Sequence, residues 1–357
     1  MRRLVFVQPA VPKYRVPFFD KISKLYNIQI FTSKIDFLGV KTVYCDDRVR
    51  ICSDFISFFQ NKILWMKGLP LIAGYSKEDV VVINGNPRVI NYMMLFFILK
   101  LRGIKTVWWG HGWSAGSHGL LSKFRISMMR MANAVLVYTD KEKYALGLAN
   151  VFALNNGLDS KEIQCSIKLA NATRRNFDGV FYLVFIGRLT KKTNLELLLM
   201  ALSGTNSKVH LNVIGDGENS VYYKSLAKSL GVADRIHWHG AVFEECDIAK
   251  IMLTSHAFIY AGSVGLSLIH AFNYGLPAII HSNFKNHMPE FAAFKNDYNG
   301  VSFEEGNHIE LSKKIEGFFS MDKNAYNKMS KNAFDTIVNS YNVDDMTVRF
   351  NNMIRAL

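Results

Sequence analysis

The sequence feature that most constrains the fold is a repeated alternation of short apolar runs with longer segments of helical periodicity. In the first half of the chain the apolar runs cover residues 4–7, 27–32, 79–84, 105–109 and 134–138. In the second half they cover residues 181–186, 209–214, 235–239, 257–261 and 278–281. Strands that alternate with helices form a parallel sheet whose two faces are both covered. The sequence therefore predicts an α/β protein with two parallel-sheet domains in succession.

The polar stretch at residues 160–178 is the expected linker between these domains. A chain of 357 residues is long enough to build two separate cores. We expect a first domain over residues 1–165 and a second over residues 166–340. Open parallel sheets bind their ligands beyond the carboxyl ends of the strands, so the loops that follow the strands should carry the site.

The net charge of +14 lies almost entirely in the first domain. Residues 1–165 contain 23 Lys and Arg against 11 Asp and Glu, whereas residues 166–357 contain 20 against 18. A lopsided basic domain favours contact with a polyanion or an anionic membrane surface, although basic residues can also serve solubility alone. Apolar residues at 55–65 and 93–97 would assist such peripheral membrane binding. No nucleic-acid-binding motif accompanies the basic half.

Targeting signals and cysteines point to a protein of the cytoplasm. The N-terminal apolar run stops at Pro9, so it predicts a strand and not a secretion signal. The longest apolar run, residues 92–99, is far shorter than the roughly 20 residues that span a bilayer. The four cysteines, which lack metal-ligand spacing, are expected to be reduced thiols: Cys45, Cys52, Cys165 and Cys246.

The stretch from Phe258 to Ile280 predicts a strand, a turn of small residues at 262–265, and a helix that Gly275 and Pro277 end. A strand, turn and helix of this kind direct backbone N–H groups and the positive end of the helix dipole at one point, which suits a phosphate. An ordinary packing turn between strand and helix is the alternative.

This stretch resembles the donor-binding signature of glycosyltransferases with the GT-B fold, especially the retaining family 4. The Ala-x-x-x-Gly-x-Pro pattern of that family is matched by Ala271, Gly275 and Pro277. The two glutamates that the family places eight residues apart are replaced by Gly262 and His270. The resemblance implies two Rossmann-like domains facing across a cleft, with the helix at residues 341–357 packing back on the first domain.

The resemblance also implies a nucleotide-sugar site on the second domain. In the Gly-Arg-Leu loop, Arg188 would grip the donor diphosphate together with Lys192 or Lys191, because the family's usual lysine position holds Thr193. Gly215 would lie near the nucleotide and His239 near its base. The turn Ser263, Val264 and Gly265 would offer N–H groups to the diphosphate, His270 would contact the ribose, and Glu290 would lie near the donor sugar as a catalytic acidic residue. Each of these residues could instead have a purely structural role in its loop or helix.

For the first domain, the resemblance implies acceptor binding. His111 lies in the glycine-flanked sequence Trp109-Gly110-His111-Gly112-Trp113 and would bind or deprotonate an acceptor hydroxyl. Tyr14 and Arg15 would line the acceptor side, with the Arg suited to an acceptor phosphate. No metal or other cofactor is expected, because cationic side chains and helix ends neutralise the leaving diphosphate in most GT-B enzymes.

We therefore expect a glycosyltransferase that moves a sugar, with retention, from a nucleotide-sugar donor to a lipid-linked or polysaccharide acceptor, in the synthesis of a bacterial surface glycan such as O-antigen or capsule. It should bind peripherally to the inner face of the membrane. Two alternatives remain open. One is a nucleotide-sugar epimerase on the same fold, and the other is a non-catalytic sugar- or membrane-binding relic, since both family glutamates are absent.

Overall fold

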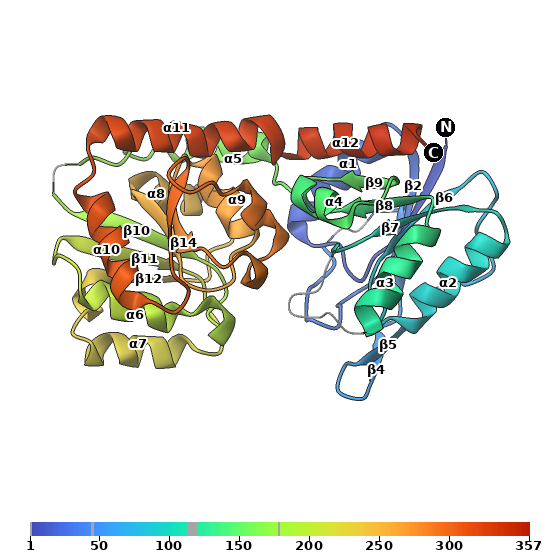
Figure 1. Ribbon diagram of the computed structural model, residues 1–357, viewed down its shortest axis with the longest axis horizontal. Helices are drawn as coiled ribbons and strands as arrows, with labels where there is room; N and C mark the ends of the chain where they lie inside the picture. The colour runs from blue at the N-terminus through green and yellow to red at the C-terminus, as the bar shows by residue number, and fades with distance from the viewer. Residues whose placement is uncertain (1, 44–45, 113–119, 178) are drawn as a thin grey trace. The chain divides into compact units, whose positions relative to one another are not determined.

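The structure is a computed structural model that describes residues 2–43, 46–112, 120–177 and 179–357. It divides into two compact units, the first formed by Met1–Asn156 with Val343–Leu357 and the second by Gly157–Asn342. Each unit contains a parallel sheet with helices on both faces (Figure 1). The predicted fold class, α/β with two Rossmann-like domains, is confirmed.

The sheet of the first unit has the strand order β3-β2-β1-β6-β7-β8-β9, and every neighbouring pair is parallel. Side chains alternate across it as strand geometry requires, so that Leu4 and Phe6 enter one core cluster while Val5 and Val7 enter another. The strands are β1 (Arg3–Val7), β2 (Asn27–Ser33), β3 (Val49–Cys52), β6 (Val80–Asn84), β7 (Lys105–Trp109), β8 (Ala134–Val137) and β9 (Val151–Ala153).

Helices from both ends of the chain cover this sheet. One face packs against α1 (Val16–Ser23) and α12 (Val343–Arg355). The other face packs against α2 (Ile90–Leu101) and α3 (Leu120–Met131), while α4 (Asp140–Leu146) follows β8. A short 3-10 helix, Lys13–Arg15, leads into α1.

A two-stranded hairpin extends from the first unit outside its main sheet. It consists of β4 (Phe55–Phe58) and β5 (Ile63–Met66), which pair antiparallel. Its base is held to α2 because the Asn91 side chain donates to the Met66 carbonyl at 2.7 Å and accepts from the Met66 N–H at 3.1 Å. The hairpin projects below β6 and β7 in Figure 1.

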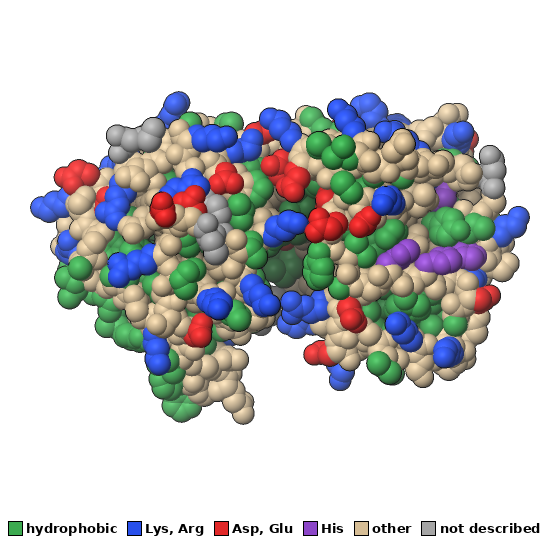
Figure 2. Space-filling view, turned by 180° about the vertical axis from the view of Figure 1, so that it is seen from behind, with side chains coloured by type: hydrophobic (Ala, Val, Ile, Leu, Met, Phe, Trp, Pro, Cys, Tyr) green, Lys and Arg blue, Asp and Glu red, His purple; other side chains and the backbone are tan. Residues whose placement is uncertain are grey.

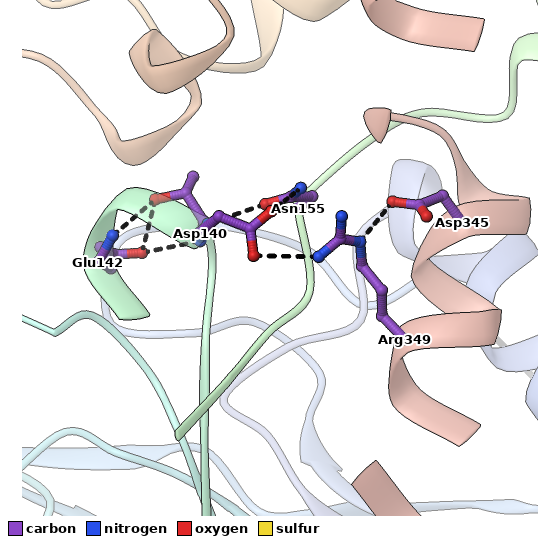
Figure 3. Close-up of polar contacts among 6 residues, drawn as sticks. Asp140, Glu142, Asn155, Asp345 and Arg349 are labelled. Atoms are coloured by element: carbon purple, nitrogen blue, oxygen red, sulfur yellow. Dashed lines mark hydrogen bonds and ion pairs between the residues drawn. The ribbon is translucent and has the colours of Figure 1, made fainter. Parts of the chain in front are cut away.

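The C-terminal helix α12 is tied to the first unit by packing and by ions. The ring of Phe350 stacks on Phe6 with centroids 5.7 Å apart and is 0% exposed. Arg349 donates to Asp345 on its own helix at 2.6 Å and to Asp140, at the start of α4, at 3.1 Å (Figure 3). The last helix is therefore a structural part of the first unit.

The second unit is built on the sheet β12-β11-β10-β13-β14-β15, again with parallel pairs throughout. Its strands are β10 (Phe181–Ile186), β11 (Val209–Ile214), β12 (Ile236–Gly240), β13 (Ala257–Tyr260), β14 (Ala278–His281) and β15 (Gly300–Phe303). Its helices are α5 (Ser160–Ala170), α6 (Leu195–Ser203), α7 (Ser220–Ser229), α8 (Glu245–Thr254), α9 (Leu266–Asn273), α10 (His308–Phe319) and α11 (Lys323–Ser340). All of them share one core cluster.

The division between the units differs from the predicted linker. Residues 160–178 were expected to connect two domains, but Ser160–Ala170 forms α5 and belongs to the second unit. The helix forms because Asp159 caps its first turn, accepting from the N–H groups of Lys161 and Glu162, and because Ile163 is buried. A largely polar amphipathic helix is easily mistaken for a linker.

The described residues contain no helix that is both long and apolar enough to cross a membrane. Of the four cysteines, Cys52, Cys165 and Cys246 are free thiols, and Cys45 lies outside the described residues.

Candidate functional site

The carboxyl edge of the second sheet brings three backbone turns into direct contact through glycines. A Cβ at Gly215, after β11, would lie 1.9 Å from the carbonyl oxygen of Gly187, which follows β10. A Cβ at Gly217 would lie 2.5 Å from the carbonyl oxygen of Leu189. Only glycine permits this approach, and Gly215 also has a φ of +139° that other residues rarely adopt. The glycines that the sequence singled out therefore allow the turns to pack.

The turn after β13 packs against the same loop. A Cβ at Gly262 would lie 2.1 Å from the Lys192 carbonyl oxygen and 2.6 Å from the Thr193 carbonyl carbon. The neighbouring Ser263 N–H donates to that Lys192 oxygen at 3.2 Å. Gly262 thus stands where the family carries a glutamate because the backbone of residues 192–193 occupies the space of any side chain.

The turn offers fewer free N–H groups than the sequence predicted. The Ser263 N–H is bonded to Lys192, and the Val264 N–H donates to Nδ1 of His287 at 3.1 Å. Within the described residues, only the Gly265 N–H of these three lacks a partner. The expectation that all three meet a diphosphate is corrected accordingly. Gly265 and the uncapped first turn of α9 remain available.

His287 supports this turn and was missed by sequence reasoning. Its Nε2 donates to the His281 carbonyl at 2.8 Å, and its ring stacks on His281 and on Phe291, with centroids 3.7 Å and 4.1 Å apart. Burial lowers the pKa of His287 to about 4, which keeps the ring neutral so that Nδ1 can accept from Val264. No sequence signal distinguished this histidine from its neighbours.

Glu290 lies beside the same turn. It is 5% exposed, in the 3-10 helix Pro289–Ala293, and its Oε2 would be 3.6 Å from a Cβ at Gly265. The structure therefore brings the predicted acidic residue next to Gly265, at the start of α9.

Two cations stand on the loop after β10. Both Arg188 and Lys192 are exposed, and neither side chain makes a hydrogen bond or ion pair among the residues that the structure describes. Thr193, which occupies the family's lysine position, is 5% exposed and donates its hydroxyl to the Thr190 carbonyl at 2.6 Å. Thr193 is therefore part of the loop's framework, and the charge at this point comes from Arg188 and Lys192.

His270 is held in place by Glu245, a residue that no sequence motif indicated. Its Nε2 lies 2.7 Å from Oε1 of Glu245 on α8, and the same oxygen accepts from the Tyr274 hydroxyl at 2.5 Å. Burial and the Glu245 charge raise the pKa of Tyr274, so the phenol stays protonated as a donor. The position of the second family glutamate thus carries a His–Glu pair, with the ring's Nδ1 left for another contact.

His239, at the end of β12, is paired within the sheet. Its Nε2 lies 2.9 Å from Oδ1 of the buried Asn212 on β11. The next residue, Gly240, accepts a hydrogen bond from the Gly215 N–H at 2.7 Å. His239 is exposed and adjoins the glycine turns, but one of its ring nitrogens is committed to Asn212.

In the first unit, His111 follows β7 and is positioned by Glu142. The Glu142 carboxylate, almost fully buried, accepts from the N–H groups of Gly112 at 3.0 Å and Thr139 at 3.1 Å, and its Oε1 lies 3.8 Å from Nδ1 of His111. Loss of hydration and the charge of Arg125 hold the pKa of His111 below its usual value. Thr139 and Glu142 form a capping box, a sequence signal that could have identified Glu142.

The loop after β1 holds the two predicted acceptor residues. Tyr14 is 40% exposed, whereas Arg15 is buried with its guanidinium stacked over the Trp109 ring, 5.1 Å from Cζ to the ring centroid. Arg15 therefore contacts Trp109, the last residue of β7, and His111 follows two residues later. Trp113 and the rest of the loop to residue 119 lie outside the described residues.

A cavity of about 510 Å³ opens between the first turns of α6 and α7, and of the predicted site residues Lys191 alone lines it. Its lining residues are Lys191, Asn194, Glu196, Asn219, Tyr222 and Tyr223. No group of three or more His, Cys, Asp or Glu side chains able to hold a metal ion occurs in the described part of the chain.

Two parallel-sheet units with glycine turns and cations at a carboxyl edge define a GT-B glycosyltransferase fold. Residues 170–336 match the family described as glycosyl transferases group 1. The match lies within the second unit, and the fold of the chain is that of the GT-B glycosyltransferases.

Solved structures agree on the fold at low sequence identity. The lipopolysaccharide outer core galactosyltransferase WaaB, in its apo form, has a TM-score of 0.72 at 15% identity, over 99% of each chain. The Anabaena protein Alr3699/HepE in complex with UDP has a TM-score of 0.72 at 15% identity, over 100% of each chain. The sucrose-phosphate synthase of Thermosynechococcus elongatus has a TM-score of 0.69 at 13% identity, over 99% of this chain and 98% of that one. No curated protein matches the chain at a significant level.

We predict that Gly262→Ala destabilises the second unit, because the new methyl group would overlap the Lys192 carbonyl. Overpacking of this kind costs about 1–3 kcal/mol, and the Ser263 hydrogen bond would be lost as well. Urea unfolding measures the change. Gly262→Glu should be at least as harmful and should not raise activity.

Gly317→Ala is the matched control, because Gly317 lies in helix α10 with nothing within 4 Å of a Cβ. Alanine there should be neutral or stabilising by up to about 1 kcal/mol. Equal effects of the two alanines would contradict the packing described for Gly262.

Proposed function

We propose that the protein is a glycosyltransferase that uses a nucleotide-sugar donor and retains the anomeric configuration. The observation that carries this proposal is a pair of exposed cations without acidic partners in the described residues, Arg188 and Lys192, on a loop whose backbone at Lys192 contacts the Gly262–Gly265 turn. A guanidinium fork and an ammonium beside a helix start suit a diphosphate. The group 1 family match supports the same assignment.

The donor would bind along the carboxyl edge of the second sheet. Arg188, Lys192 and the Gly265 N–H would neutralise the diphosphate, without a metal, as the leaving group acquires charge. Glu290, which packs against Gly265, would face the donor sugar. His270 and its partner Glu245 would bind the ribose, which restores a carboxylate to the position where the family has one. His239 would border the base.

The first unit would bind the acceptor, with His111 as the base for its hydroxyl. The lowered pKa of His111 keeps its imidazole neutral at pH 7, the form in which a ring nitrogen can accept a hydrogen bond from the acceptor hydroxyl. Glu142 would fix the loop that presents it, through the Gly112 N–H. We propose a lipid-linked or polysaccharide acceptor, in bacterial surface glycan synthesis.

Two substitutions should separate donor binding from chemistry. Arg188→Ala should weaken UDP binding by about 1.5–3 kcal/mol, because a charge-assisted contact is removed. His111→Asn should leave UDP affinity unchanged and lower turnover on the order of 100-fold. Calorimetric titration with UDP and initial-rate assays measure the two effects, since UDP is the nucleotide in the HepE structure.

Each variant controls for the other, and Arg174→Ala, an exposed arginine elsewhere in the second unit, controls for loss of charge alone. Unchanged UDP affinity in Arg188→Ala would remove Arg188 from the donor site. Unchanged turnover in His111→Asn would make that histidine structural.

We also propose that the protein works at the cytoplasmic face of an anionic membrane and contacts it through the tip of the β4–β5 hairpin. Phe58 is 48% exposed and Phe59 is 75% exposed at this tip. Three successive residues, Phe59–Asn61, have left-handed backbone angles, with φ from 52° to 65°. Such a conformation is costly for a bulky residue, and it turns an aromatic ring toward solvent.

The surroundings of the tip suit an interfacial position. Lys62 is the single charged residue of the hairpin, and Arg88 beside it donates to the Asn61 carbonyl at 3.4 Å. Figure 2 shows apolar side chains along one side of the end of this protrusion. Along α2 a second stripe is exposed at Met94, Phe97 and neighbouring turns, whereas Met93, which the sequence analysis included, is buried.

Replacing both aromatic rings, as Phe58→Ser with Phe59→Ser, should weaken binding to phosphatidylcholine–phosphatidylglycerol vesicles about tenfold or more, because a buried Phe contributes roughly 1.5–3 kcal/mol. Vesicle flotation measures it, and binding should fall as salt rises. Phe243→Ser removes an equally exposed ring (76%) from the second unit and should have no effect.

Equal binding of the double variant and the parent would refute hairpin insertion. A change from dimer to monomer in the double variant, seen by sedimentation, would instead assign the tip to a contact between two copies of the chain.

A further inference from the structure

A buried arginine without an acidic partner lies at the carboxyl edge of the first sheet. Arg15 ends the 3-10 helix Lys13–Arg15 and is only 8% exposed. Its guanidinium stacks between two rings, with Cζ 5.2 Å from the Tyr14 centroid and 5.1 Å from the Trp109 centroid. Its Nη1 is buried and has no hydrogen-bond partner in the part of the chain that the structure describes.

Burial of an unpaired guanidinium is unfavourable in the free protein. A guanidinium carries five N–H donors, and buried charges in proteins are almost always paired with an opposite charge. Stacking on aromatic faces offsets part of the lost hydration but satisfies none of the in-plane N–H donors. The conformation of Arg15 is therefore the one expected of a residue whose anionic partner is a ligand.

Two further buried donors belong to the same edge of the sheet and to the same face. Gln8 directly follows β1 and Trp109 ends β7. Their side-chain nitrogens, Gln8 Nε2 and Trp109 Nε1, are buried and have no hydrogen-bond partner among the described residues. Gln8 stands two residues after Phe6, so strand alternation puts both on the face that α1 and α12 cover. All three unpartnered atoms are donors, which indicates a ligand rich in acceptor oxygens.

We propose that Arg15, Gln8 and Trp109 form a binding site for a phosphoryl group. A phosphoryl group has three terminal oxygens and can accept from all three donors at once, whereas a carboxylate has two. Identification of this group as a phosphate carried by the acceptor rests on the proposed glycosyltransferase function. The anion site itself does not, because it rests on the first unit alone.

The test is thermal unfolding of the whole protein with increasing inorganic phosphate, for the parent, Arg15→Met and Arg50→Met. Methionine keeps much of the aliphatic stem and removes the charge. Arg50 is the matched control, since it also stacks on a ring, that of Phe31 at 5.9 Å, but is exposed. Sodium chloride and acetate at equal ionic strength separate phosphoryl binding from screening and from carboxylate binding.

Without phosphate, Arg15→Met should unfold at the same temperature as the parent or higher, because an unpaired buried charge has been removed. Phosphate should stabilise both the parent and Arg50→Met. Arg15→Met should bind phosphate at least about tenfold more weakly than the parent does. Comparison between variants at one phosphate concentration cancels the general stabilising effect of phosphate on proteins.

Three results would overturn the proposal. A Tm of Arg15→Met several degrees below the parent, with no difference in phosphate response, would make Arg15 structural. Equal stabilisation by acetate and phosphate would overturn the phosphoryl assignment. If Arg50→Met lowers the affinity for phosphate as much as Arg15→Met does, the effect reflects net charge and not a specific site.

UDP titration of the same proteins keeps the two ideas distinct. Arg15→Met should bind UDP like the parent. If the parent binds phosphate through Arg15 but never binds UDP, the anion site stands and the donor assignment fails.

Discussion

The close approach of backbone segments at the carboxyl edge of the second sheet is the constraint on which the candidate donor site depends. Gly215 meets Gly187, Gly217 meets Leu189, and Gly262 meets the carbonyls of residues 192–193. These contacts leave no room for a side chain at the positions that make them. They fix the loop that carries Arg188 and Lys192 against the turn that begins α9, so the cations and the helix start are held together before any ligand binds.

The same constraint explains why this chain departs from the glutamate pattern of the glycosyltransferase family that it resembles. A glutamate at position 262 would overlap the neighbouring loop. The acidic side chains near the candidate donor site lie at other positions, at Glu290 beside Gly265 and at Glu245 beside His270. In the first unit Glu142 positions loops in a similar way. Its buried carboxylate accepts hydrogen bonds from N–H groups of the loops after β7 and β8. In both units, loops at the strand ends are positioned by carboxylates or backbone contacts that are remote in sequence.

Much of the fold could be predicted from the sequence, because it depends on local patterns. Apolar runs such as 4–7 and 181–186 have the length and composition of buried parallel strands, and each forms one. The short edge strands β3, β9 and β15 were missed. Each has only three or four residues, some of them exposed or half-buried, so none shows the continuous apolar run that predicts a buried strand. Helix α5 was taken for a linker because its buried face is narrow.

The site was less predictable, because its pairings join residues far apart in the chain. A motif located Arg188 and the turn at 262–265, but no local pattern shows that His287 takes the Val264 N–H or that Glu245 holds His270. Unpartnered donors such as the Arg15 Nη1 become visible only when every neighbour is known. Whether a side chain is buried, and whether each of its donors and acceptors has a partner, depends on the folded chain and not on a local motif.

Sugar transfer can be observed by nuclear magnetic resonance of the protein incubated with UDP-, GDP-, dTDP- and CMP-sugars, with and without membrane lipid extract. We expect cleavage of the bond between sugar and diphosphate in a UDP-, GDP- or dTDP-sugar, with release of the nucleoside diphosphate and retention at the anomeric carbon of the product. Conversion of the sugar nucleotide to its epimer without nucleotide release would contradict transfer. An unchanged spectrum for all four donors in both conditions would contradict catalysis altogether.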